Sequence, residues 1–337
     1  MKAVGYRQSL PITAPASLLD VDLPDPTPTG RDLLVAVRAV SVNPVDTKVR
    51  VRTAPPPGET KVLGWDASGV VVAVGPDVTL FKPGDEVWYA GSLARPGTDS
   101  ELHLVDERIV GRKPQSLGFA HAAALPLTTI TAWELLFDRF GVPPGKRPTE
   151  ETLLIVGAAG GVGSILVQLA CRLTSLTVIG TASRQETTDW VLSLGAHHVI
   201  DHSKSLVAEL KRIGFPAVTH VASLTQTESH FPEIVEVLAP QGKLGLIDDP
   251  KILDVMPLKR KSISVHWELM FTRPLFATAD MVAQHRLLSE TATLVDAGVI
   301  RTTLAEHFGR ITAQNLKRAH ALIESCRSKG KIVLEGF

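Results

Sequence analysis

The sequence contains very little cysteine. Its 337 residues include two cysteines, Cys171 and Cys326, and neither belongs to a C-x-x-C pair. A disulfide framework and a four-cysteine zinc lobe both need more cysteines, so both are excluded. Cys171 falls within an apolar helical pattern, where it is expected to be a small buried residue.

The chain also lacks an excess of charge of either sign. Lys and Arg together number 35, as do Asp and Glu, and the net charge is zero. No basic stripe and no block of like charges is present, so nucleic acid is not an expected partner. Residues 1–10 contain no apolar signal core, and the expected location is the cytoplasm, without membrane association. The length is sufficient for two domains.

One stretch, residues 153–172, combines an apolar strand, a glycine-rich turn and an apolar helix. This order is typical of a diphosphate site, because glycine lets the backbone approach phosphate and the first helical N–H groups point toward it. Ala158 replaces the first glycine of the usual G-x-G-x-x-G pattern, so a simple tight turn in an α/β protein is the alternative. A membrane helix is disfavoured by the four glycines and by Gln168 and Arg172. The residues predicted to bind cofactor here are Ala159, Gly160, Gly161, Val162 and Gly163.

An acidic residue is missing where a site for NAD usually has one. The second strand, residues 177–181, ends in Ala182-Ser183-Arg184, and no Asp or Glu occurs between Glu151 and Glu186. A hydroxyl followed by a guanidinium suits the 2′-phosphate of NADPH by charge and by forked hydrogen bonds. We therefore predict NADPH as the cofactor, bound by Thr181, Ser183 and Arg184. The alternative is that Arg184 is an ordinary solvated loop residue.

The pattern of strands and helices changes along the chain. Short strands with Gly/Pro turns dominate the first 125 residues, as in a small barrel or irregular sandwich. Strands and helices then alternate, which predicts an α/β fold with a doubly wound parallel sheet. Helices are expected at 131–140, 278–297 and 315–325, with a closing strand at 331–334. We expect a β-rich domain of residues 1–126 completed by 275–337, and a nucleotide domain of residues 127–274.

Four segments in this order resemble the medium-chain dehydrogenase/reductase superfamily, also called the zinc-containing alcohol dehydrogenase superfamily. They are residues 64–71 (GWDASGVV), 81–87 (FKPGDEV), 125–133 (LPLTTITAW) and 158–163 (AAGGVG). The N-P-x-D segment at residues 43–46 is similar to the quinone oxidoreductase branch. The resemblance covers almost the whole chain. It implies a Rossmann nucleotide domain and a GroES-like catalytic domain.

Zinc ligands are missing where the zinc-dependent branch has them. Its first metal-binding cysteine falls at about residues 43–46, and its G-H-E segment is Gly64-Trp65-Asp66 here. Catalytic zinc needs about three converging N, S or O ligands. Asp46 and Asp66 alone would hold it poorly, so we predict no metal. A zinc-dependent alcohol dehydrogenase remains the alternative enzyme, and a catalytically silent, crystallin-like nucleotide-binding relative is the non-enzymatic alternative.

The resemblance implies an NADPH-dependent reductase that transfers hydride to a quinone or α,β-unsaturated carbonyl. Asn43 is expected to donate a hydrogen bond to the substrate oxygen, Asp46 to orient its neighbours, and Thr131 to contact the nicotinamide. Trp65 and Trp88 are candidates for a flat substrate wall, with core packing as the alternative.

The remaining cofactor positions rest on the resemblance alone. The expected lining of the cofactor site is His202, Leu246, Ile247, Met270 and Phe271. His202 stands where the family often has tyrosine, and Thr187 where it often has lysine. Members commonly pair through an edge strand, which predicts a homodimer through the region of Ser262 to Val265.

Overall fold

The computed structural model describes residues 1–337 and divides them into two compact units. Unit 1 comprises residues 1–130 and 271–337, and unit 2 comprises residues 131–270. The sequence places the two boundaries after residues 126 and 274. No helix in either unit combines the length and apolar character needed to cross a bilayer.

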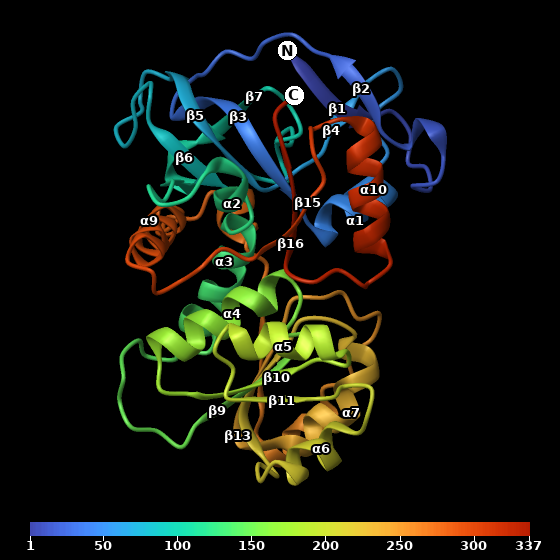
Figure 1. Ribbon diagram of the computed structural model, residues 1–337, viewed down its shortest axis with the longest axis vertical. Coiled ribbons are helices and arrows are strands. Elements are labelled where there is room, and N and C mark those ends of the chain that lie inside the picture. The colour runs from blue at the N-terminus through green and yellow to red at the C-terminus, as the bar shows by residue number, and fades with distance from the viewer. The chain divides into compact units, whose positions relative to one another are not determined.

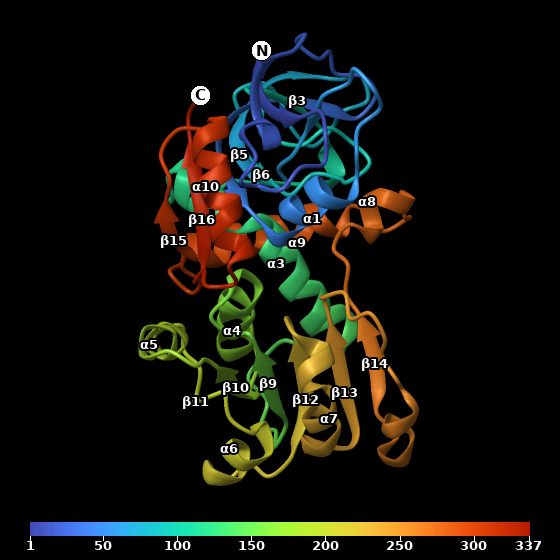
Figure 2. The ribbon, with the colours of Figure 1, turned by 90° about the vertical axis from the view of Figure 1, so that its right-hand side faces the viewer.

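Unit 2 is built on a six-stranded parallel sheet, as the alternating pattern predicts (Figure 1). The strand order is β11-β10-β9-β12-β13-β14, so β14 is an edge strand (Figure 2). The strands are β9 (Thr152–Val156), β10 (Thr177–Thr181), β11 (His198–Ile200), β12 (Val218–Ser223), β13 (Leu238–Leu246) and β14 (Ser264–Trp267). The helices are α4 (Gly161–Leu173), α5 (Gln185–Ser193), α6 (Leu206–Arg212) and α7 (Thr227–Val237).

Every side chain of β9 is buried, because helices cover both faces of the sheet. Leu154 and Val156 share one core with residues of α6 and α7. Leu153 and Ile155 point to the opposite face by strand alternation. All six strands run in parallel, so their carboxyl ends lie along one edge. The α/β doubly wound prediction is therefore confirmed.

Unit 1 is β-rich, and the C-terminal end of the chain completes it. A seven-stranded sheet has the order β15-β16-β3-β5-β6-β8 with β7 paired to β3, and a second sheet has the order β2-β1-β4. The larger sheet contains β3 (Asp32–Val42), β5 (Ala67–Val74), β6 (Glu86–Tyr89), β7 (Leu102–Asp106), β8 (Val110–Arg112), β15 (Leu304–His307) and β16 (Lys331–Glu335). The smaller contains β1 (Lys2–Tyr6), β2 (Leu19–Asp22) and β4 (Lys61–Val62). The helices of unit 1 include α1 (Pro44–Arg52), α2 (Phe119–Ala123), α8 (Thr272–Phe276), α9 (Ala283–Asp296) and α10 (Ala313–Glu324).

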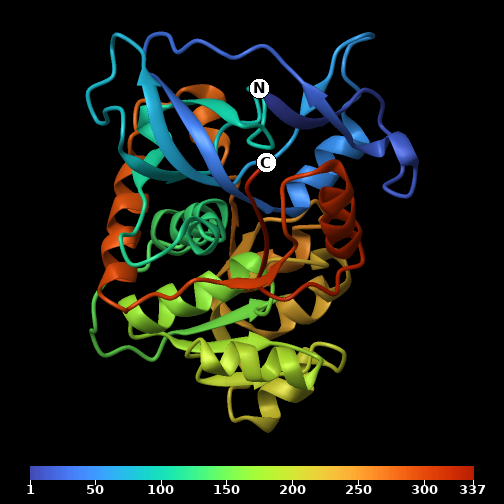
Figure 3. The ribbon, with the colours of Figure 1, turned by 45° about the horizontal axis from the view of Figure 1, so that its top comes forward.

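The structure corrects three expectations about helices. Residues 44–52 form a helix, α1, that the sequence reading missed, and it packs against α10 (Figure 3). The helix expected at 131–140 begins earlier as α3 (Pro126–Trp133) and continues as the π-helix η3 (Glu134–Arg139). The helix expected to start at residue 278 starts at Ala283 instead. Thr278 and Asp280 hydrogen-bond to each other and form a turn before it.

Candidate functional site

The glycine-rich turn joins β9 to the N-terminus of α4. Gly160 is the N-cap residue, with extended backbone, and the helix starts at Gly161. A Cβ atom at Gly163 would lie 2.5 Å from the Gly157 carbonyl oxygen and 2.6 Å from the Ala158 Cα atom. Only glycine allows this close approach of helix and strand. At Gly160 a Cβ atom would meet only the Gly157 oxygen, at 3.5 Å. The fold itself therefore leaves room for a side chain at Gly160.

Thr181, at the end of β10, holds the glycine turn in place. Its buried Oγ1 accepts a hydrogen bond from the Gly157 N–H at 3.1 Å and lies 3.1 Å from Nδ1 of His202. Burial, followed by the nearby His230, lowers the pKa of His202, which favours the neutral imidazole. Thr181 and His202 are therefore brought together, with Thr181 supporting the turn rather than facing outward.

Ser183 and Arg184 follow β10 and are exposed at the sheet edge. Arg184 is the N-cap residue of α5, and its N–H donates to Thr187 Oγ1 at 3.3 Å. The Thr187 hydroxyl donates back to the Arg184 carbonyl at 2.8 Å. Thr187 therefore fixes the backbone from which the Arg184 side chain projects.

The other predicted cofactor residues of unit 2 lie at the same sheet edge. Leu246 ends β13 and is buried, and Ile247 follows it half-buried. Met270 lies three residues after β14 and is buried. Asp248 accepts hydrogen bonds from the N–H and hydroxyl of Thr227, at 2.9 and 2.5 Å, which anchors the loop after β13 to α7.

Unit 1 contains a buried polar cluster around Lys331, the first residue of β16. The Lys331 Nζ atom lies 3.1 Å from Asp66 Oδ2, donates to the Val42 carbonyl at 3.1 Å and also donates to Asn43 Oδ1. The Asn43 amide donates to Asp66 Oδ2 at 3.0 Å and to the Ser41 carbonyl at 3.2 Å. Asp66 Oδ1 accepts from the Leu127 N–H at 2.9 Å. All three ammonium protons and both amide protons therefore have partners.

Two further carboxyl groups lie beside this cluster. Asp46 Oδ2 accepts from the Asn43 N–H at 2.5 Å, and Asp99 is buried nearby. Burial raises the pKa of Asp46 to about 7, and burial together with Asp46 raises the pKa of Asp99. Burial also raises the pKa of Asp66, while Lys331 opposes that rise. Asp66 is thus held against the Lys331 ammonium group, which favours its charged form, while burial opposes it.

Comparison with known proteins agrees with this architecture. Residues 29–127 match the alcohol dehydrogenase GroES-like domain, and residues 194–334 match the zinc-binding dehydrogenase domain. A zinc-type alcohol dehydrogenase-like protein of Staphylococcus aureus strain MSSA476 is 39% identical over 99% of both chains. The chain belongs to the medium-chain dehydrogenase/reductase superfamily. At this level it is an oxidoreductase that uses a nicotinamide cofactor.

Solved structures of this superfamily are similar over the whole chain. One, from Rhizobium etli CFN 42, is 60% identical with a TM-score of 0.96, covering 100% of this chain and 98% of the other. Its assignment as a zinc-dependent alcohol dehydrogenase is provisional. Another is the Escherichia coli quinone oxidoreductase complexed with NADPH, 25% identical with a TM-score of 0.84, covering 99% and 100%.

The residues of this superfamily member do not fit a catalytic zinc. No three His, Cys, Asp or Glu side chains converge on a point that could hold a metal. Both oxygens of Asp66 are occupied by hydrogen bonds, and one of the donors is an ammonium group that would repel a second cation. An internal cation, Lys331, thus neutralises the carboxylate of the G-W-D segment.

The two candidate tryptophans are enclosed. Trp65 is 1% exposed, its indole N–H donates to the Ser92 carbonyl at 3.1 Å, and its ring meets Phe271 edge-on at 6.4 Å. Trp88 is 0% exposed within β6. A fully enclosed ring offers no face to a substrate, so the structure supports core packing for Trp88. The sequence did not indicate that Trp65 and Phe271 would be in contact.

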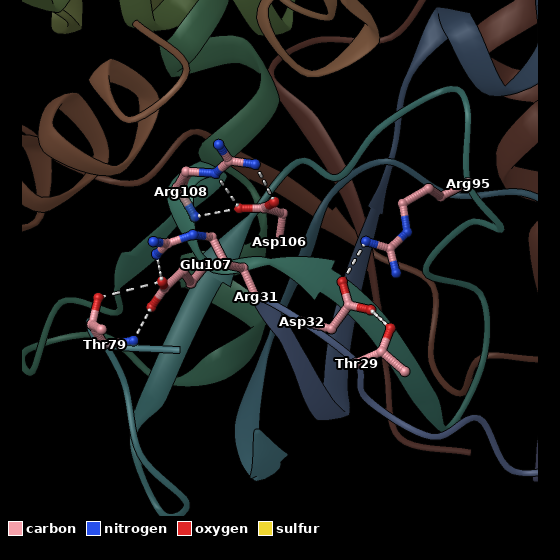
Figure 4. Close-up of polar contacts among 8 residues, drawn as sticks. All are labelled: Thr29, Arg31, Asp32, Thr79, Arg95, Asp106, Glu107 and Arg108. Atoms are coloured by element: carbon pink, nitrogen blue, oxygen red, sulfur yellow. Dashed lines mark hydrogen bonds and ion pairs between the residues drawn. The ribbon is translucent and has the colours of Figure 1, made fainter. Parts of the chain in front are cut away.

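A separate hollow of about 170 Å³ in unit 1 is lined in part by Arg95, Arg108 and Met281. Its arginines are not available for an anion, as Figure 4 shows. Arg95 pairs with Asp32 at 2.7 Å, and Arg108 makes a forked pair with Asp106 at 2.7 and 3.0 Å. These charges are compensated internally, so the hollow is not a candidate active site.

The sequence reading missed several residues of these polar networks. Lys331 carried a signal, since a lysine at the start of a buried closing strand needs a partner. In unit 2, the Arg139 Nε–H donates to Glu268 Oε2 at 2.8 Å, and Glu134 lies beside Glu268. These three residues carried no signal, because they are ordinary charged residues until the fold brings them together.

Proposed function

We propose that the protein is an NADPH-dependent reductase that transfers hydride, without zinc, to a quinone or an α,β-unsaturated carbonyl. The observation that carries this proposal is the Lys331–Asp66 pair, which neutralises the only carboxylate of the G-W-D segment. A bound metal would act as a Lewis acid on an alcohol oxygen, so a zinc-free mechanism favours a substrate that is already electrophilic. A conjugated carbonyl is already electrophilic and needs positioning and a hydrogen bond at its oxygen.

The glycine turn supports a dinucleotide site in unit 2. The N–H groups at the start of α4 suit a diphosphate, and the contact at Gly163 keeps helix and strand close enough to present them. When bound, the reduced nicotinamide supplies the hydride, and a proton from solvent completes the reduction.

Several features favour NADPH over NADH. Ser183 and Arg184 are exposed at the end of β10, and no acidic residue lies between Glu151 and Glu186. The similar Escherichia coli quinone oxidoreductase was crystallised with NADPH. A guanidinium beside a hydroxyl can bind the 2′-phosphate, whereas an acid would repel it.

A zinc-free reduction needs a hydrogen-bond donor to the substrate oxygen. Asn43 is 1% exposed and both of its amide protons already have acceptors, so it can act only if one of these bonds is released. Thr131, which is expected to contact the nicotinamide, is the next residue to test in this role. An Asn43→Ala variant would disturb the Lys331 cluster as well as any donor role. Thr131→Val is therefore the cleaner first substitution.

A homodimer through β14 is also proposed. β14 is the edge of the parallel sheet, and Trp267 and Leu269 are 54% and 50% exposed. An unpaired edge with exposed apolar side chains is suited to pairing with a second copy.

The central test measures reduction of quinones, enones and aldehydes with NADPH, before and after exhaustive treatment with a chelator. We expect reduction of a quinone or enone at an unchanged rate, with substoichiometric zinc by metal analysis. Stoichiometric zinc whose removal abolishes activity would instead establish the zinc-dependent alcohol dehydrogenase.

A further inference from the structure

Two buried carboxyl groups meet in unit 2, outside the residues already assigned. Glu134 is the first residue of the π-helix η3, and Glu268 is the first residue after β14. Their residues are 0% and 3% exposed. Arg139, at the end of η3, donates from Nε to Glu268 Oε2 at 2.8 Å. The Arg139 guanidinium therefore pairs with one of the two acids.

The second oxygen of Glu268 shows how the two acids coexist. Glu268 Oε1 is buried and accepts no hydrogen bond from a protein N–H or O–H group, while the Glu134 carboxyl lies within hydrogen-bonding reach of this side chain. Two adjacent ionised carboxylates repel, so one proton held between them satisfies both the charge and the open oxygen. Burial and the Glu134 carboxyl raise the pKa of Glu268 to about 9, in spite of Arg139.

The pair lies at the sheet edge that carries the expected nicotinamide pocket. The Glu268 N–H donates to the Leu246 carbonyl at 2.9 Å, which ties the end of β14 to the end of β13. Met270 is two residues further on, and Thr131 is one helical turn before Glu134. The shared proton thus joins the segment carrying Thr131 to the segment carrying Met270.

We propose that Glu134 and Glu268 are positioning residues that hold the nicotinamide pocket in shape through a shared proton. This inference rests on the proposed function only in taking Thr131, Leu246 and Met270 as pocket residues. Loss of the proton leaves two buried carboxylates against one arginine, and their repulsion displaces the segment after β14. Cofactor affinity therefore falls as the pH rises through the titration of the pair.

The other charged or titratable groups around the pair are Arg139, His266 and Lys243. Arg139 on η3 is the guanidinium that pairs with Glu268 Oε2. Burial, Lys243 on β13 and Arg139 lower the pKa of His266 on β14, so this imidazole is already neutral at alkaline pH. Lys243 donates from its ammonium to the Phe140 carbonyl.

The experiment measures the dissociation constants of NADPH and NADH by nicotinamide fluorescence across the neutral to alkaline range. In the unmodified protein we expect both constants to rise about tenfold, which corresponds to a pKa change of about one unit on cofactor binding. Glu134→Gln keeps a hydrogen-bond donor toward Glu268 without a titrating proton, so its constants should stay flat. Glu236→Gln, an exposed residue of α7, serves as the matched control and should follow the unmodified protein.

NADH has no 2′-phosphate, so an equal response of both cofactors separates this effect from phosphate recognition. By linkage, cofactor binding near the pKa of the pair should take up a proton, measurable by calorimetry in buffers of different ionisation enthalpy. A Glu134→Gln profile that rises like that of the unmodified protein would overturn the proposal. If this variant does not fold, absence of proton uptake by the unmodified protein overturns it instead. The dissociation constants and the proton uptake are both measured without a substrate. Failure of this proposal is therefore distinguished from failure of the proposed quinone or enone reduction.

Discussion

At the scale of single residues, charge and its compensation decide what this protein can do. Arg184 is exposed at the start of α5, directly after β10, and is the residue proposed to bind the 2′-phosphate. Lys331 is buried, and its ammonium group contacts Asp66 Oδ2, the Val42 carbonyl and Asn43 Oδ1. Arg184 lies at the surface, whereas Lys331 is enclosed by its three partners.

Replacing Arg184 with Ala tests recognition of the 2′-phosphate. NADPH binding should weaken by about 1–3 kcal/mol, the range for a hydrogen bond to a charged group, and NADH binding should hardly change. Fluorescence titration of both cofactors measures the difference. Arg260→Ala, at an exposed arginine of the turn before β14, is the control. Equal losses for the two cofactors would show that Arg184 does not contact the phosphate.

Replacing Lys331 with Met tests the internal cation. Removing one partner of a buried pair leaves Asp66 uncompensated, so the free energy of unfolding should fall by about 3–5 kcal/mol in urea denaturation. Without Lys331 the pKa of Asp66 rises further above its unfolded value. Such a carboxyl costs stability as the pH rises, so the loss should shrink in acid. The double variant Lys331→Met, Asp66→Asn should recover part of the loss, and no recovery would contradict the pairing.

At the scale of elements, the start of a helix shapes a candidate region in each unit. The N-P-x-D segment starts α1: Asn43 has an extended backbone, Pro44 occupies the first helical turn, and Asp46 accepts from the Asn43 N–H. This segment thus begins α1 and also contributes Asn43, which contacts Lys331, to the buried polar cluster. In unit 2, the glycine turn begins α4 and lets that helix pack closely against the end of β9.

Two alanine substitutions in that turn should separate folding from binding. A Cβ atom at Gly163 collides with backbone atoms of Gly157 and Ala158, so Gly163→Ala should lower the thermal midpoint of unit 2. At Gly160 the protein leaves room for a Cβ atom, and that atom would occupy space at the N-terminus of α4, where the diphosphate is proposed to bind. Gly160→Ala should therefore keep the thermal midpoint and weaken NADPH binding. Calorimetry and fluorescence titration check the two effects; identical behaviour of the variants would refute the distinction.

At the scale of the whole molecule, the exposed edge of the parallel sheet is the expected assembly surface. Trp267→Lys places a charge on that edge, which disfavours strand pairing. Light scattering at micromolar concentration should give a dimer mass for the unmodified protein and a monomer mass for this variant. Val72→Lys, an exposed apolar residue on β5 of unit 1, should remain dimeric. A monomeric unmodified protein would remove the assembly proposal.

The sequence alone determined the two kinds of domain, the glycine turn, and the absence of an acid after β10. These depend on local periodicity, on glycine and on short-range order, which are properties of neighbouring residues. It also indicated that the zinc ligands are missing, because an absent residue type is visible without a fold.

Only the tertiary structure decided which charged residues meet. Lys331 pairs with Asp66 across 265 positions (331 − 66), and Glu268 meets Glu134 across 134 (268 − 134). No periodicity links such distant residues, and each pair becomes significant only when burial removes water from its charges. The enclosed Trp88 and the π-helical turn at Glu134 depend likewise on packing by distant segments, which local propensity does not encode.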